Sequence, residues 1–176
     1  FLWYSLLSTG VYGFFISIDM FTMFMFYEVA LIPMYLLIGV WGTGRKEYSA
    51  MKLTLMLMGG SAFLMLGLLG IYWHGTPEGM PHTWNILEIS HYGNIDYGWQ
   101  NLLFVFTFVG FGVLGAMFPF HTWSPDGHAS APTAVSMLHA GVLMKLGGYG
   151  CFRVAMYLMP EAAHELSWIF IILTTI

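Results

Sequence analysis

The stretch FPFHTWSPDGHASAPTAVSMLHAGVLMKLGGYG, Phe118–Gly150, decides the fold of this chain. It places three prolines, three histidines, an aspartate and a lysine between apolar runs. Proline lacks a backbone N–H and clashes with the preceding turn, so Pro119, Pro125 and Pro132 break a helix that the flanking residues would otherwise continue. Broken backbone at membrane depth is tolerated only where protein or a hydrated cavity surrounds it. The stretch therefore predicts a broken helix with a polar interior beside it.

The composition around this stretch is that of a membrane protein. Hydrophobic residues make up 58% of the chain and charged residues 8%, against roughly 25% charged in soluble domains. Apolar runs of spanning length predict an all-α, polytopic transmembrane helix bundle. We expect one membrane domain over 1–176, part of a longer chain, with a broken-helix segment at 119–132 and spans at about 3–18, 20–41, 50–73, 101–118, 133–158 and 163–176.

Charge and cysteine content exclude several other classes. The net charge of −4 comes without any basic block, so nucleic acid has no surface to bind. The single cysteine, Cys151, cannot form an internal disulfide, and no spacing typical of a metal site is present. We expect no metal in this chain.

The loops predict how the chain crosses the membrane. Arg45 and Lys46 lie in the loop 42–50, which the positive-inside rule places in the cytoplasm. The loop 75–99 has acidic residues and no lysine or arginine, so we expect it on the opposite side as an ordered polar excursion.

Two charged residues lie where an apolar bundle should have none. Glu28 is about eight residues into the second span, roughly 12 Å deep at ~1.5 Å per residue, and Lys145 lies near the middle of the fifth. Either would cost about 2.5–3.5 kcal/mol if it faced lipid. We expect both to face inward and find partners, as proton-carrying groups or as a static ion pair.

Histidines add groups that titrate near neutral pH. His121 and His128 flank the broken segment, and His139 precedes Lys145 by six residues. The order His121, His139, Lys145 is a plausible proton relay. The alternative for His121 and His128 is that they cap broken helix ends.

Two further charges have simpler interpretations. Asp126 follows a proline at the start of a short helical piece, where an aspartate is expected to cap the helix N-terminus. Lys52 enters the third span from its basic end and is expected to snorkel to the interface, or to approach Glu28.

Three motifs carry a resemblance to a known family. The segments FYEVALIPMY, PFHTWSPDGHASAPT and LMKLGGYG resemble the proton-translocating subunit M of bacterial NADH-quinone oxidoreductase, called chain 4 in respiratory complex I. The resemblance implies part of an inverted-repeat, antiporter-like fold. It implies that Glu28 is the family's essential membrane glutamate and that Lys145 is the lysine that passes protons toward the centre of the subunit.

The chain departs from this family at two positions. Leu114 stands where the family usually has the lysine that partners the glutamate, and His139 stands where an aliphatic residue is common. We therefore expect His139 or His121 to take over part of the relay.

The resemblance also implies the chain's setting. It implies a subunit of an NADH:quinone oxidoreductase in the bacterial inner membrane, in contact with lipid and sister antiporter-like subunits. FMN, iron–sulfur clusters and quinone are expected in partner subunits. We expect this chain to hold no redox centre and to bind no small-molecule substrate directly. The alternatives are a subunit of a multi-component cation/proton antiporter and a non-pumping structural membrane subunit.

Overall fold

The computed structural model describes residues 1–93 and 95–175, and within these ranges the chain is helical without a named β-strand. The expected all-α bundle is confirmed. Its α-helices are α1 Leu2–Ile16, α2 Met20–Trp41, α3 Lys46–His74, α4 Ile86–Tyr92, α5 Tyr97–Leu114, α6 Trp123–Ser130, α7 Thr133–Leu138, α8 Met144–Gly150, α9 Pro160–Glu165 and α10 Ser167–Thr175. The 3₁₀-helix η1 covers Phe120–Thr122, and the π-helices η2 and η3 cover His139–Leu143 and Cys151–Met156.

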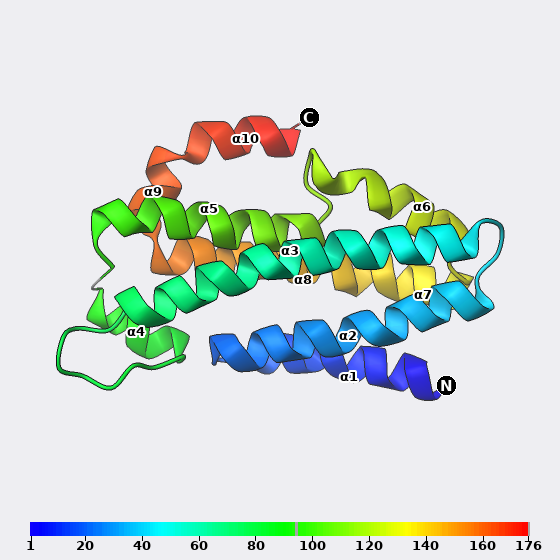
Figure 1. Cartoon of the computed structure of the whole chain (residues 1–176), viewed down its shortest axis with the longest axis horizontal. Helices are drawn as coiled ribbons and strands as arrows, with labels where there is room; N and C mark the ends of the chain where they lie inside the picture. The colour runs from blue at the N-terminus through cyan, green and yellow to red at the C-terminus, as the bar shows by residue number, and fades with distance from the viewer. Residues whose placement is uncertain (94, 176) are drawn as a thin grey trace.

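The long helices run side by side along the longest axis of the molecule (Figure 1). α3 is central, because it packs against α2 on one side and α5 on the other, while α1 pairs with α2. The segments from α7 to α8 pass behind α3 in this view, α9 rises past one end of α5, and α10 returns over α5. Three helices, α2, α3 and α5, are long and apolar enough to cross a membrane, and α1 is a shorter apolar helix.

The second predicted span has the same bounds as α2. Asp19 accepts a hydrogen bond from the backbone N–H of Thr22 at 2.8 Å and another from its hydroxyl at 2.7 Å, which caps the N-terminus of the helix. Gly42 ends the helix in an extended conformation. Pro33 lies inside α2 without ending it. Both ends of α2 are therefore set by Asp19 and Gly42, which are local signals that the sequence displays.

Two other boundaries differ from those expected. α5 begins and ends four residues earlier than the expected span at 101–118. It ends early because the chain turns at Gly115 and at Ala116, whose φ is +57°, well before Pro119. The loop at 75–99 contains the helix α4, capped by Asn85 and closed by Gly93 at φ +54°. Asn94 in this loop and Ile176 in the last expected span lie outside the described residues.

The expected helix at 133–158 is not uniform. It contains α7, η2, α8 and η3 in succession, so two π-helical segments interrupt the α-helical hydrogen bonding. π-Helical turns are uncommon and often lie at functional sites. Here they lie on either side of the helix that carries Lys145.

The helices approach each other most closely at glycines. A Cβ added to Gly147 would lie 2.4 Å from the backbone nitrogen of Gly115 and 2.5 Å from the carbonyl oxygen of Phe111, so α8 and the end of α5 touch through their backbones. A Cβ on Gly110 would meet the backbone of Leu64 at 2.8 Å in the same way. This close contact fixes α5 between α3 and α8.

Candidate proton-transfer site

Glu28 lies in the middle of α2, with a half-buried side chain. Within the described residues, its Oε1 atom is buried and has no hydrogen-bond partner. A buried polar atom without a partner is costly, and such atoms cluster where a protein needs a group that can change its proton or its partner. Glu28 is therefore the first candidate of the site.

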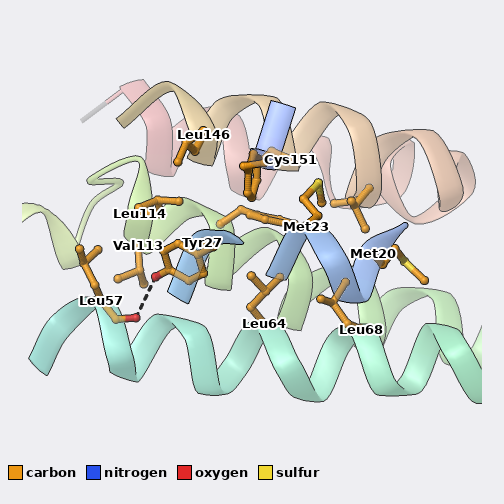
Figure 2. Packing of buried hydrophobic residues seen from close by; sticks show 14 of the residues in the cluster. Met20, Met23, Tyr27, Leu57, Leu64, Leu68, Val113, Leu114, Leu146 and Cys151 are labelled. Atoms are coloured by element: carbon orange, nitrogen blue, oxygen red, sulfur yellow. Dashed lines mark hydrogen bonds between the residues drawn. The ribbon is translucent and has the colours of Figure 1, made fainter. Parts of the chain in front are cut away.

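The neighbouring residue, Tyr27, ties this part of α2 to α3. Its hydroxyl donates a hydrogen bond to the carbonyl oxygen of Leu57 at 3.0 Å (Figure 2). Leu114 of α5 belongs to the same buried apolar cluster and is 0% exposed. The position where the resemblance would place a lysine is thus filled by dry apolar packing.

His139 is enclosed between two other rings. It is 0% exposed, and it stacks on the indole of Trp123 with centroids 5.3 Å apart and on the imidazole of His128 with centroids 4.3 Å apart. The indole N–H of Trp123 donates to the carbonyl oxygen of Val113 at 3.1 Å, which fixes that side of the stack. Both ring nitrogens of His139 lack a partner within the described residues.

The two histidines of the broken segment differ in their surroundings. His128 is half-buried, and its Nδ1 lies 3.0 Å from the hydroxyl oxygen of Ser136 on α7. His121 is exposed and stacks on the ring of Phe118 with centroids 5.7 Å apart. In the described part of the chain neither ring bonds a backbone group at a helix end, so the structure does not support the alternative that they act as caps.

Lys145 lies on a different face of the bundle from His139. Its side chain is exposed and lines a largely apolar cavity of about 720 Å³ between α5, α8 and α10. Within the described residues its ammonium forms no ion pair, so the expectation that this lysine faces inward to a partner stays a prediction. The π-helical turn η2, which precedes α8, changes which face of the helix carries it.

A second cavity of about 420 Å³ is lined by His121. It adjoins the cavity of Lys145, because Gly115, Met117 and Thr174 line both. His139 lines neither of the two. The structure thus brings His121 and Lys145 to neighbouring cavities and brings His139 to His128, and among the described residues Glu28 has no ion-pair partner.

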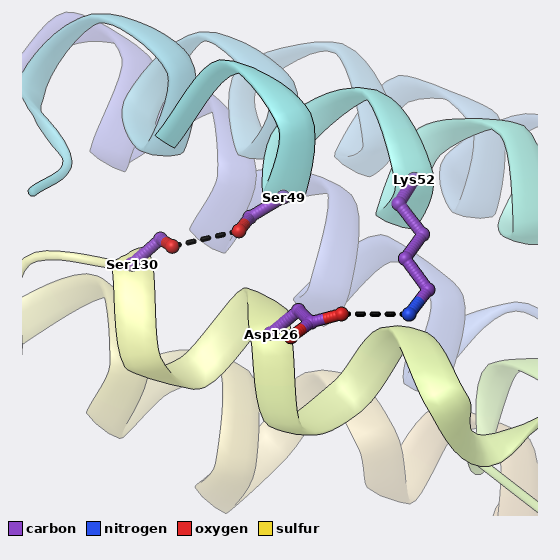
Figure 3. A network of polar contacts seen from close by, with 4 residues as sticks. All are labelled: Ser49, Lys52, Asp126 and Ser130. Carbon is purple, nitrogen blue, oxygen red and sulfur yellow. Dashed lines mark hydrogen bonds and ion pairs between the residues drawn. The ribbon is translucent and has the colours of Figure 1, made fainter. Parts of the chain in front are cut away.

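Two polar contacts between α3 and α6 were missed by the sequence reasoning. The ammonium of Lys52 donates to Asp126 Oδ2 at 2.6 Å, and the hydroxyl of Ser130 donates to that of Ser49 at 2.7 Å (Figure 3). Asp126 therefore does not cap α6, whose N-terminus has no side-chain cap, and Lys52 pairs with Asp126 instead of Glu28.

Among residues 1–93 and 95–175, no group of three or more histidine, cysteine, aspartate or glutamate side chains is arranged to hold a metal ion. The same residues contain one ion pair, Lys52–Asp126.

Comparison with known proteins gives the family. The model of the family described as NADH:quinone oxidoreductase/Mrp antiporter, TM, matches residues 17–176. The chain belongs to this family. It is an integral membrane protein with the antiporter-like fold that the three motifs indicated.

Curated relatives agree. NADH-quinone oxidoreductase subunit M of Rickettsia prowazekii is 41% identical over 167 residues, which are 93% of this chain and 32% of the relative. NAD(P)H-quinone oxidoreductase chain 4-2 of Synechocystis is 39% identical over 163 residues, 92% of this chain and 28% of the relative. The chain thus spans about a third of the length of these relatives.

Solved structures share the fold. The archaeal membrane-bound sulfane sulfur reductase contains a chain that is 24% identical, with a TM-score of 0.86 over 97% of this chain and 34% of its own. Respiratory complex I from Thermus thermophilus, with bound NADH, contains one that is 22% identical, with a TM-score of 0.86 over 97% of this chain and 36% of its own.

Proposed function

We propose that this chain forms part of a proton-translocating membrane subunit of an NADH:quinone oxidoreductase, in which Glu28 and Lys145 take up and release protons. The observation that carries the proposal is the Glu28 carboxyl group, held in the apolar helix α2 with a buried oxygen that has no partner in the described residues. Family membership supplies the setting. The bacterial inner membrane, with the loop 42–50 in the cytoplasm and the loop 75–99 on the opposite side, is part of the proposal.

The chain's own contribution is electrostatic. Oxidation of NADH and reduction of quinone take place in partner subunits that hold FMN and iron–sulfur clusters. A unit charge about 8–10 Å from a carboxyl group at an effective dielectric of 20 changes its energy by about 2 kcal/mol, and ~1.4 kcal/mol is a tenfold change in proton occupancy. Movement of charge in the neighbouring subunit is therefore sufficient to load or unload Glu28.

His121 and His139 act as intermediate carriers. His121 opens on a cavity that adjoins that of Lys145, which supports a path between these two residues through shared lining. Neither ring nitrogen of His139 has a partner in the described residues, and the ring lies against that of His128, so this branch requires a movement that brings a nitrogen of one ring to a nitrogen of the other. In this proposal the single relay His121, His139, Lys145 is replaced by two branches. One joins His121 to Lys145, and the other joins His139 to His128.

The decisive experiment measures the ratio of protons moved to electrons transferred in the intact complex carrying Glu28→Gln. We expect electron transfer to continue and the ratio to fall. The control is Glu47→Gln, which removes an exposed carboxylate at the start of α3. An unchanged ratio in Glu28→Gln would contradict the proposal and favour a non-pumping structural subunit, for which the buried Leu114 is the best support.

A cation/proton antiporter is the second candidate, because the description of the matching family names both kinds of complex. Copurification separates them. Flavin and iron–sulfur subunits in the purified complex favour the oxidoreductase, whereas a purely membranous set of partners favours the antiporter.

A further inference from the structure

We propose that Lys52 and Asp126 are positioning residues that hold α6 against α3, so that His128 stays stacked on His139 throughout turnover. The Lys52–Asp126 ion pair and the Ser49–Ser130 hydrogen bond together are called the clasp below. Its effect on pumping rests on the function proposed above, but its existence does not.

The clasp has matching spacing on its two helices. Asp126 and Ser130 are four residues apart on α6, and Ser49 and Lys52 are three apart on α3, so each pair lies on one helix face. The two contacts, 2.6 Å and 2.7 Å long, run in parallel between these faces (Figure 3).

A third attachment fixes the same end of α6. The carbonyl oxygen of Ser130 accepts a hydrogen bond of 2.9 Å from the backbone N–H of Thr43, in the turn between α2 and α3. α6 has eight residues, and Pro132 follows it, so it gains little support from helical hydrogen bonding alone, since isolated helices below about 12 residues are marginal. Its position therefore depends on contacts of this kind.

Residues of α6 lie directly against His139, so a movement of α6 changes the surroundings of that ring. Gly127 lies between α3 and η2, where an added Cβ would meet Leu53 Cδ1 at 3.0 Å and His139 Cε1 at 3.7 Å. His128 follows in sequence and supplies the ring that stacks on His139. Because these contacts leave little free space, displacement of α6 away from α3 would change both the stack and the enclosure of His139.

Loss of one charge should displace α6 more than exchange of the two charges. The Lys52 and Asp126 side chains are 23% and 38% exposed, so the pair is partly open to solvent. Removal of one partner leaves the other without its counter-charge and free to turn toward water, whereas exchange of the two residues preserves the pair.

The first test measures the clasp without reference to pumping. Ser49→Cys and Ser130→Cys are combined in a Cys151→Ala background of the full complex, and disulfide yield is measured in membranes under a mild oxidant. We expect the cysteines to pair readily, Asp126→Asn to lower the initial rate at least threefold, and Lys52→Asp/Asp126→Lys to restore it. Glu47→Gln is the matched control and should change nothing. Failure to form the disulfide, or equal rates with and without the ion pair, would overturn the proposal.

The second test asks what the clasp does during turnover. The double-cysteine complex with the disulfide formed should pump within about twofold of the rate that it has with free thiols. A clasp that stays closed during turnover is not affected by a covalent lock. Asp126→Asn should shift the pH profile of pumping, and the charge exchange should return it. A locked complex that transfers electrons but no longer pumps would show that the clasp must open, and would overturn the proposal. If Glu28→Gln pumps normally while the disulfide results hold, the proposed function alone fails.

Discussion

The imidazole rings of His128 and His139 stack with their centroids 4.3 Å apart, at the junction of α6 and η2. Two positive charges at about this distance repel by about 4 kcal/mol at an effective dielectric of 20. This repulsion disfavours a state in which the half-buried ring and the enclosed ring are both charged.

His139→Leu should make the protein more stable and the pump worse. The substitution restores the aliphatic residue common in the family and removes two buried nitrogens without partners, each of which costs on the order of 1–3 kcal/mol. We expect a higher unfolding temperature of the complex and a proton-to-electron ratio below half of the starting value. His91→Leu, an exposed histidine on α4, is the control. Unchanged pumping together with unchanged stability would remove His139 from the relay.

Leu114→Lys tests whether the family's usual acid–base pair can be restored. Leu114 is fully buried, so a lysine there costs about 2.5–3.5 kcal/mol unless it finds a counter-charge. We expect the single variant to assemble because Glu28 pairs with it, and Leu114→Lys/Glu28→Gln to lose assembly. Leu114→Met, expected to cost less than about 1.5 kcal/mol, controls for packing. If neither Leu114→Lys nor His139→Ala alters pumping, the idea that a histidine replaces the missing lysine is refuted.

Gly147→Ala should destabilise the bundle where Gly148→Ala should not. The new methyl group at position 147 would press on backbone atoms of Gly115 and Phe111, which cannot move aside as a side chain would. Overpacking of this kind costs about 1–3 kcal/mol. Gly148 has no atom within 4 Å of an added Cβ, and alanine is the better helix former by about 1 kcal/mol. Thermal unfolding of the two variants should shift in opposite directions.

Glu165 should make stability depend on acid pH. Its carboxylate accepts hydrogen bonds from the Tyr97 hydroxyl at 2.7 Å and the Asn101 amide at 2.8 Å, and these lower its pKa. The stabilisation is complete above the ordinary glutamate pKa of about 4.3 and disappears as the pH falls through the lowered folded value. Unfolding temperatures of the starting protein and of Glu165→Gln should therefore differ at pH 7 and converge in acid. A constant difference at every pH would show that the carboxylate charge contributes nothing.

The sequence predicted those parts of the fold that local signals determine. α2 has the expected bounds because Asp19 and Gly42 mark its ends. The end of α5 could not be placed, because the chain turns at Ala116 in a conformation that a non-glycine residue seldom adopts, several residues before the proline that marked the break. The seven residues of α4 are too few to show a helical period.

The candidate site was only partly visible in the sequence for the same reason. Glu28 could be recognised by its depth in an apolar run, a property of α2 alone. The Lys52–Asp126 pair joins residues 74 positions apart, and no local pattern reports such a contact. The expectation that Lys145 faces inward to a partner stays a prediction, and the sequence did not show that η2 changes the number of residues per turn just before it.

The π-helical turn η2 therefore sets the direction of a charged group that lies outside it. An α-helix advances by about 100° per residue, so loss of a single residue from η2 would return the helix to α geometry and turn Lys145 by roughly that angle relative to His139. Insertions and deletions in this short segment would thus redirect the lysine between neighbouring helices while every side chain kept its identity. The backbone hydrogen bonding of η2, one turn before Lys145, sets the direction of the amine. A side-chain substitution that keeps this backbone leaves that direction unchanged.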